Sequence, residues 1–175
     1  HEYRAPLVRF TGRKTAGWLA KHLLLWFAVC AIGLFPRIHQ AQETTPLEHV
    51  VKSIYLIKFP KFIDWPEGTF SDTSERITIG ILGEDPFGKD FDQLIQDQTA
   101  KGRGFVIKRS KEVQSLTDCH VLFICSSEAA RLKEILKAYK NKPVLTIGDT
   151  EEFSRLGGII EFVKVGGRVK FRINN

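Results

Sequence analysis

Residues 83–90 form an almost complete phosphate-binding loop, with the sequence GEDPFGKD. In such a loop, backbone N–H groups and a lysine hold phosphates, and a Ser or Thr hydroxyl reaches magnesium. Here Asp90 stands where that hydroxyl is needed, and Glu84 and Asp85 put negative charge where phosphates would lie. The pattern therefore favours a plain turn between a strand and a helix over nucleotide hydrolysis.

A second candidate site is a crevice for a small molecule. Asp85, Phe87 and Gly88 follow the first predicted strand, and Asp149 follows the fourth. Ligands of α/β proteins often bind outside the carboxyl ends of parallel strands, so these four residues are predicted to line a ligand crevice. The structural alternative is that the acids after the fourth strand complement the dipole of a helix that begins there.

Cysteines and histidines offer no framework for a metal site. Cys119 and Cys125 flank a predicted strand, whose rise of about 3.3 Å per residue separates their Cα atoms by roughly 20 Å. A disulfide needs a Cα separation under about 7 Å, so we expect two buried thiols, with an intermolecular bridge as the open alternative. His49 and His120 lie at no ligand spacing. No G-x-S-x-G or H-E-x-x-H motif is present, so we predict no metal and no cofactor, and an enzyme with another mechanism stays open at this point.

Aromatic side chains gather between residues 55 and 70, with lysines among them. The aromatic residues are Tyr55, Phe59, Phe62, Trp65 and Phe70, and the lysines are Lys52, Lys58 and Lys61. About half of these aromatic rings are expected to pack a helix onto a sheet. The others could form an interface core, where aromatic residues are enriched. We predict Tyr55, Phe59, Phe62 and Trp65 as the surface for a partner or a second copy.

Apolar periodicity predicts the elements that position these residues. A helix is expected from Thr45-Pro46-Leu47-Glu48, which reads as a capping box with proline in the first turn, to a kink or end at Pro60. Further helices are expected at 91–95, at 132–139 with Ser126 or Ser127 as its cap, and near 151–155. Strands are expected at 77–82, 105–108, 120–124, 144–147, 159–163 and 169–173. Alternating strands and helices predict a three-layer, Rossmann-like α/β fold, with a mostly parallel sheet and a C-terminal β-hairpin at one side.

The composition is that of a globular protein, with 43% hydrophobic and 26% charged residues among 175. The net charge of +6 comes mainly from residues 1–41, which hold six of the 26 bases and one of the 20 acids. Residues 42–175 therefore carry 20 bases and 19 acids, a net charge of +1. This balance gives no general attraction for nucleic acid.

The N-terminal segment has the layout of a secretory signal. Residues 4–21 are basic and free of acids, the apolar run LLLWFAVCAIGLF covers 23–35, and Ala41 offers a small residue for cleavage. The run is shorter than the roughly 20 residues of a transmembrane helix. We therefore expect a signal segment over 1–41 and a single exported domain over 42–175. The alternative is an uncleaved signal anchor, which would be the protein's only membrane contact.

Several motifs in order resemble the YfiR-like family of exported regulators. They are VKSIY at 51–55, Phe59, KF at 61–62, WP at 65–66, ILGEDPFG at 81–88, CHVLFI at 119–124, SE at 127–128, VLTI at 144–147, GGII at 157–160 and RVKFRIN at 168–174. The resemblance implies a periplasmic, non-catalytic α/β domain. It also implies binding to the periplasmic part of an inner-membrane diguanylate cyclase, whose repression lowers cyclic-di-GMP and biofilm formation.

The resemblance further implies a homodimer and redox control through cysteines. This chain departs from the family pattern at three places. First, Gly80 stands where members often carry a cysteine, so Cys119 lacks that partner. Second, Pro60 stands where members continue the helix. Third, the C-terminal helix expected after Asn174 is missing, which would leave apolar sheet surface uncovered. The alternative function is a periplasmic sensor that binds a small molecule.

Overall fold

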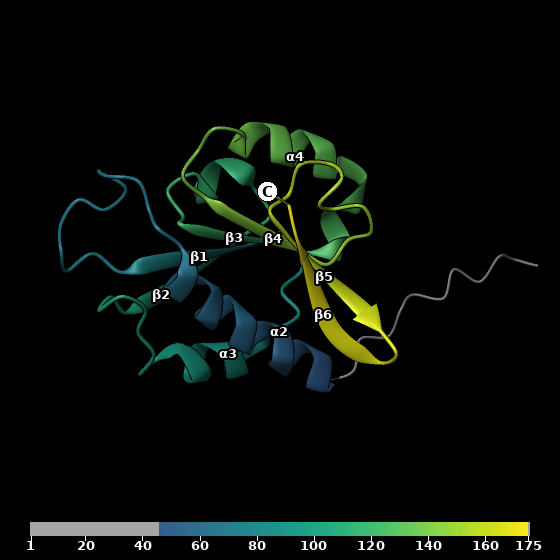
Figure 1. Ribbon diagram of the computed structural model, residues 1–175, viewed down its shortest axis with the longest axis horizontal. Coiled ribbons are helices and arrows are strands. Elements are labelled where there is room, and N and C mark those ends of the chain that lie inside the picture. Colours follow the sequence, from purple (N-terminus) through teal and green to yellow (C-terminus); the bar gives the residue numbers. More distant parts are fainter. Residues whose placement is uncertain (1–45, 175) are drawn as a thin grey trace, which may run out of the picture. The chain divides into compact units, whose positions relative to one another are not determined.

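A six-stranded sheet separates two layers of helices (Figure 1). The computed structural model describes residues 46–174. Its strands are β1 (Ile77–Leu82), β2 (Phe105–Ser110), β3 (Val121–Ile124), β4 (Leu145–Gly148), β5 (Ile160–Val165) and β6 (Arg168–Ile173). They lie in the order β2-β1-β3-β4-β5-β6, all parallel except β6, which runs antiparallel to β5. The predicted three-layer α/β fold with a C-terminal hairpin at one side is confirmed.

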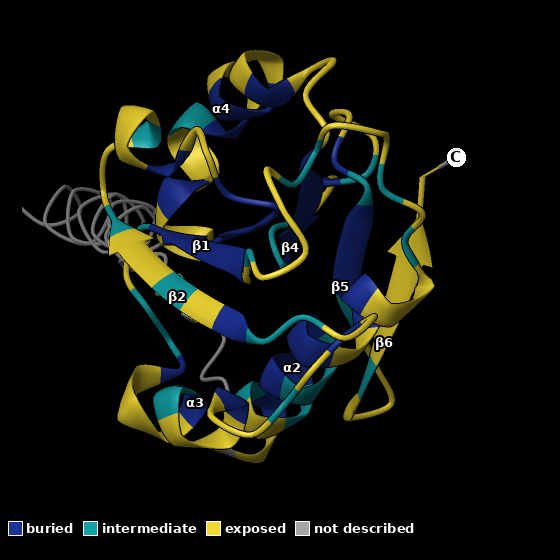
Figure 2. Cartoon of the chain, turned by 90° about the vertical axis from the view of Figure 1, so that its left-hand side faces the viewer, coloured by how far each residue is buried: buried dark blue, intermediate teal, exposed yellow. Residues whose placement is uncertain are grey.

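Two apolar clusters hold the helices to the two faces of the sheet. The helices are α2 (Pro46–Lys58), α3 (Gly88–Ile95) and α4 (Leu132–Tyr139), with the 3₁₀ turns η1 (Phe59–Phe62), η2 (Val113–Leu116) and η3 (Ser126–Arg131). The first cluster joins α2 and α3 to one face, and the second joins α4 and η2 to the other. Every residue of β1, β3 and β4 is buried, as expected for strands covered on both faces. The outer strands β2 and β6 are largely exposed (Figure 2).

The first helix changes geometry where the sequence predicts it. α2 ends at Lys58, and η1 continues the chain as a tighter turn that contains Pro60. Proline has no N–H to donate to the carbonyl four residues earlier, so the α-helical ladder cannot pass through it. A turn then follows, closed by a hydrogen bond from the Thr69 N–H to the Pro66 carbonyl. The chain beyond α2 is therefore redirected and leads into a long loop before β1.

The C-terminal hairpin depends on its two central glycines. Gly166 and Gly167 have φ angles of 58° and 74°. A two-residue turn with positive φ at both positions matches the right-handed twist of the strands it joins, and glycine adopts it without steric cost. The turn sets the register in which Phe162 pairs with Phe171, so both rings face the same side of the sheet.

Two local predictions are wrong. Residues 151–157 form hydrogen-bonded turns rather than the short helix expected near 151–155, because Glu152 has a φ of 64°, outside the helical region. Neither Ser126 nor Ser127 caps the helix at 132–139, since η3 precedes that helix and has no side-chain cap. The Ser127 hydroxyl instead accepts a hydrogen bond from the Glu84 N–H and ties η3 to the loop after β1.

A buried ion-pair network fixes α2 to the sheet. The Lys52 ammonium lies 2.7 Å from Asp149 at the end of β4 and 2.8 Å from Glu48. Glu48 also pairs with Lys164 of β5 at 3.1 Å. Burial alone would lower the pKa of Lys52, but the Asp149 and Glu48 carboxylates outweigh that effect and raise it. The ammonium therefore stays charged, and the network joins the first turns of α2 to two strands.

Replacing Lys52 with alanine should strongly destabilise the fold. The change leaves Asp149 and Glu48 buried without their shared cation, and breaking a buried pair in this way costs about 3–5 kcal/mol. Chemical denaturation of Lys52→Ala measures this loss. Lys58→Ala, at an exposed position of the same helix, is the control and should change the free energy of unfolding by less than about 0.5 kcal/mol. Equal effects of the two changes would contradict the role given to the network.

Candidate partner-binding surface

Tyr55 and Phe59 pack against the C-terminal hairpin. Their rings stack with centroids 5.4 Å apart, and Phe171 of β6 meets Phe59 at 5.1 Å and Tyr55 at 5.4 Å. Phe162 of β5 lies 6.0 Å from both. Tyr55 is half-buried and Phe59 is buried. These two rings therefore join α2 and η1 to the hairpin, and they hold Phe171 of β6 in place.

Phe62 is the most exposed of the four predicted surface residues. Its side chain is 80% exposed at the end of η1, while Phe171 and Ile173 on β6 are 39% and 57% exposed. β6 is also the last strand of the sheet, so one of its edges has no neighbouring strand among residues 46–174. Exposed apolar side chains on an edge strand are typical of a contact surface.

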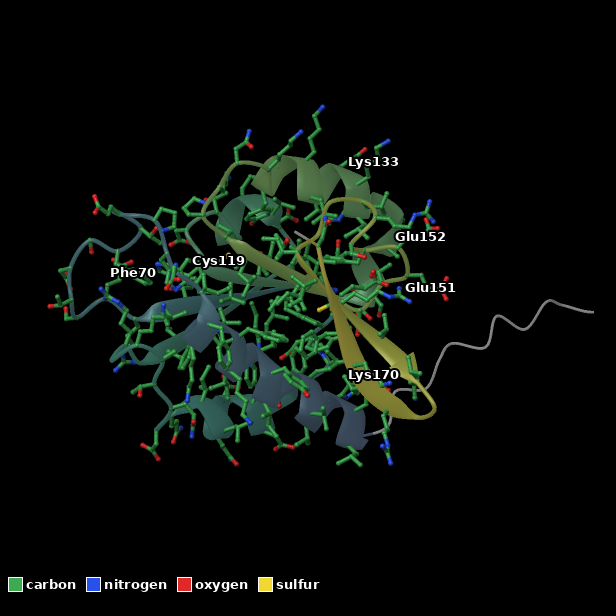
Figure 3. The ribbon with its side chains drawn as sticks, viewed as in Figure 1. Phe70, Cys119, Lys133, Glu151, Glu152 and Lys170 are labelled. Carbon is green, nitrogen blue, oxygen red and sulfur yellow. The ribbon has the colours of Figure 1, made fainter. Side chains whose placement is uncertain are left out.

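Trp65 belongs to a separate group of rings at the other end of the sheet. It meets Phe70 and His120 edge-on, each at 6.0 Å, and Phe70 stacks on His120 at 4.5 Å. The Arg103 guanidinium lies 4.0 Å from the Phe70 ring centre. Phe70 and Cys119 lie on the same side of the molecule, away from Lys170 of the hairpin (Figure 3). The structure therefore divides the predicted surface into a group on the hairpin and a group around His120.

His120 anchors the loop that carries Trp65 and Phe70. The Thr78 N–H donates to its Nδ1 at 3.0 Å, so this nitrogen carries no proton, and Nε2 lies 3.7 Å from Glu75. Burial lowers the pKa of His120, and this outweighs the opposing effect of Glu75. The sequence placed His120 in a buried strand but gave no sign of its contacts with Phe70 and Glu75, because these loop residues lie far from it along the chain.

The free energy of unfolding should fall as the pH drops below about 6.5, where a histidine of the unfolded chain takes up a proton. The folded state holds His120 neutral because its pKa is lowered, so acid favours the unfolded state. The slope approaches at most about 1.4 kcal/mol per pH unit, until the folded-state pKa is reached.

Denaturation at pH 7 and pH 5.5 tests this expectation with two variants. His120→Asn keeps an acceptor for the Thr78 N–H and should remove most of the difference between the two pH values. His49→Asn should keep the difference, because His120 is still present. A pH effect that survives in His120→Asn would assign it to other groups.

The four predicted crevice residues make contacts within the fold. Asp85 accepts hydrogen bonds from the N–H groups of Phe87 and Gly88, and it pairs with Arg109 at 2.7 Å. Phe87 is buried, with its ring 4.9 Å from that of Phe123 in β3. Segment 83–87 is thus a strand-to-helix turn, and α3 begins at Gly88.

Asp149 keeps one polar atom without a partner. Its Oδ2 binds Lys52, but its Oδ1 and the Thr150 hydroxyl are buried without hydrogen-bond partners among the described residues. In the turn after β1, a Cβ on Gly83 would lie 2.5 Å from the Ser127 hydroxyl, so this turn packs closely against η3. The ligand crevice remains a prediction. Of its four residues, Asp149 is the one with a buried oxygen that has no hydrogen-bond partner among the described residues.

Both cysteines of the described chain are free and buried, and Cys30 lies outside the described residues. Burial raises the pKa of the Cys119 thiol to about 12 and raises that of Cys125 as well. Reactive cysteines have the opposite property, a lowered pKa in an accessible site. Cys119 nevertheless faces Gly80, where an added Cβ would lie 3.3 Å from the Cys119 Cβ and 3.2 Å from its Sγ.

Gly80→Cys should therefore form a disulfide with Cys119 under oxidising conditions. The separation is close to the roughly 3.5–4.5 Å between Cβ atoms in disulfides, and closing a loop of this length stabilises by about 3–4 kcal/mol. Thiol counting and intact mass detect the bond, and denaturation with and without reductant measures its effect. Gly80→Ser, similar in size, should show no effect of reductant. Two free thiols in oxidised Gly80→Cys would contradict the geometry.

The sequence of this domain matches a known protein family. A sequence model described as YfiR/HmsC-like matches residues 49–175. The match covers more than half of the chain, and the protein belongs to this family. No curated protein matches the chain. Within residues 46–174, no helix is long and apolar enough to cross a bilayer, and no three His, Cys, Asp or Glu side chains are arranged to hold a metal ion.

Proposed function

We propose that this protein is an exported, non-catalytic regulator that binds the periplasmic part of an inner-membrane diguanylate cyclase and represses it. Membership of the YfiR/HmsC-like family carries this proposal. The expected signal segment at 1–41 lies outside the described residues and supports export through its sequence alone. Repression of the cyclase would lower cyclic-di-GMP and, with it, biofilm formation.

The contacts of the charged residues support a binding role. Lys52, Asp85 and Asp149 each form ion pairs within the fold. His120 is held neutral beneath aromatic rings rather than beside a nucleophile. A catalytic acid or base has to reach a substrate, and these groups are engaged in holding α2, the turn after β1 and the loop before β1.

The partner surface is centred on Phe62 and continues onto Phe171 and Ile173 of β6. Large exposed aromatic and aliphatic side chains are the usual anchors of protein interfaces. Tyr55 and Phe59 support this surface from beneath through their contacts with Phe171. Trp65 forms a second contact area through the loop held by His120. A homodimer through the unpaired edge of β6 is the competing use of the same surface.

Phe62→Ser should abolish recovery of a membrane cyclase with the protein. The full chain, tagged at its C-terminus, is expressed in its own cells and captured from detergent-solubilised membranes. Leu47→Ser is the matched control, because Leu47 is 71% exposed in α2 and Phe62 is 80% exposed in η1. Removing an aromatic anchor costs about 2 kcal/mol or more, which is roughly a 30-fold loss of affinity.

The control should recover the cyclase as the wild-type chain does. If Phe62→Ser recovers the cyclase at the wild-type level, the partner surface does not include Phe62 of η1. Sedimentation of the same variants distinguishes the competing use of this surface. A loss of self-association in Phe62→Ser, with cyclase recovery unchanged, would assign the surface to a dimer.

A further inference from the structure

A surface cavity lies on the face of the sheet opposite α2. It has a volume of about 470 Å³ and lies between α4 and the loop that follows β4. Leu136 and Tyr139 of α4, Val144 before β4, and Leu156 and Ile159 of the loop give it apolar walls. Binding sites for small molecules commonly have volumes of about 300–1,000 Å³ and mostly apolar walls. The cavity therefore has the size and lining of a ligand site.

Four lysines line the same cavity, and no acidic residue does. Lys133, Lys137, Lys140 and Lys142 all border it. None of their ammonium groups forms an ion pair among residues 46–174. Like charges four residues apart on a helix repel each other, so Lys133 and Lys137 oppose each other across one turn. Figure 3 shows Lys133 on α4, and Glu151 and Glu152 on the loop after β4. The arrangement concentrates positive charge in a domain whose overall charge is nearly balanced.

The helix dipole explains only part of this arrangement. Lys137 and Lys140 lie at the C-terminal end of α4, where cations stabilise a helix. Lys133 lies in the first turn of α4, where the dipole disfavours a cation. Lys142 lies beyond the helix, with its ammonium 5.1 Å from the centre of the Tyr139 ring. The helix dipole therefore does not account for Lys133 and Lys142.

The apolar walls are held in place without a ligand. The Tyr139 hydroxyl donates to the Val113 carbonyl at 3.2 Å, which fixes the ring beneath Lys142. The Ile159 N–H donates to the Thr146 hydroxyl at 3.1 Å, which fixes the loop against β4. A preformed site loses less entropy when it binds a ligand than a site that must first be ordered.

We propose that this cavity binds a small organic anion with an apolar body, such as a medium-chain carboxylate. The anionic group would meet the four lysines, and the apolar body would cover Leu136, Leu156 and Ile159. The site shares no residue with the partner surface, and Leu136, Tyr139 and Val144 of its lining belong to the apolar cluster on the α4 face. Binding here is therefore independent of the proposed function.

Decanoate, acetate and decylamine, each added to the full chain, test whether the cavity requires both a negative charge and an apolar body in its ligand. Backbone amide shifts report where each probe binds. Decanoate should shift amides at 137–146 and 156–159 in a saturable way. Acetate has the charge without the body, and decylamine has the body with the opposite charge. Both should bind at least ten-fold more weakly. Added salt should weaken the binding of decanoate, because it screens the lysines.

Matched variants locate the site. The double change Lys137→Glu with Lys142→Glu should weaken decanoate at least ten-fold, and Leu156→Ser should weaken it at least three-fold. The controls lie on α3, on the other face: Lys89→Glu for the charge, and Leu94→Ser for the apolar wall, since Leu94 is 37% and Leu156 40% exposed. Both controls should stay within two-fold of the wild-type chain.

Three outcomes would overturn the proposal. The first is shifts spread over both faces of the sheet, or no saturable shift at all. The second is equal binding of decylamine and decanoate, which would remove the role of the lysines. The third is an equal loss of affinity in the cavity variants and in the α3 controls. Because the readout is binding to the isolated chain, none of these outcomes depends on the membrane partner.

Discussion

The buried contact between Lys52 and Asp149 determines where α2 lies on the sheet. A charged pair of this kind is stable only in one geometry, because a small displacement leaves an uncompensated charge in an apolar environment. Glu48 extends the constraint to Lys164, so α2 is tied to both β4 and β5. The position of α2 then sets the packing of Tyr55 and Phe59 on the hairpin and the direction in which η1 presents Phe62. The proposed partner surface therefore depends on an ion pair that no partner would touch.

The two faces of the sheet have different chemistry because different elements cover them. On the side of α2, aromatic rings from η1, β5 and β6 meet, and Phe62, Phe171 and Ile173 expose apolar side chains. On the side of α4, lysines border an apolar cavity. A regulator with both features would combine a protein contact on one face with a small anion on the other. The strands β1, β3 and β4 that separate the two faces are buried throughout.

The parts of the fold that depend on local chemistry could be predicted from the sequence. The positive φ angles at Gly166 and Gly167, the end of α2 before Pro60 and the buried run of β3 all follow from residue types and short spacings. Contacts between distant residues could not be predicted: Lys52 reads as a solvated lysine until Asp149, 97 positions away, is placed beside it. Phe59 likewise reads as a surface residue until Phe171 covers it. The short helix expected near 151–155 does not form. Glu152 adopts a turn conformation, and the helix propensity of these residues is too weak a preference to prevent it.

The central claim is that this chain lowers cyclic-di-GMP through a surface centred on Phe62, and the cyclic-di-GMP content of cells tests it most directly. Cells that lack the chain are given back the wild-type chain, Phe62→Ser or Leu47→Ser at equal periplasmic levels. The account predicts that the wild-type chain and Leu47→Ser lower cyclic-di-GMP, while Phe62→Ser leaves it as high as in cells without the chain. A cyclic-di-GMP content that is unchanged by the wild-type chain, or lowered equally by Phe62→Ser, would contradict it.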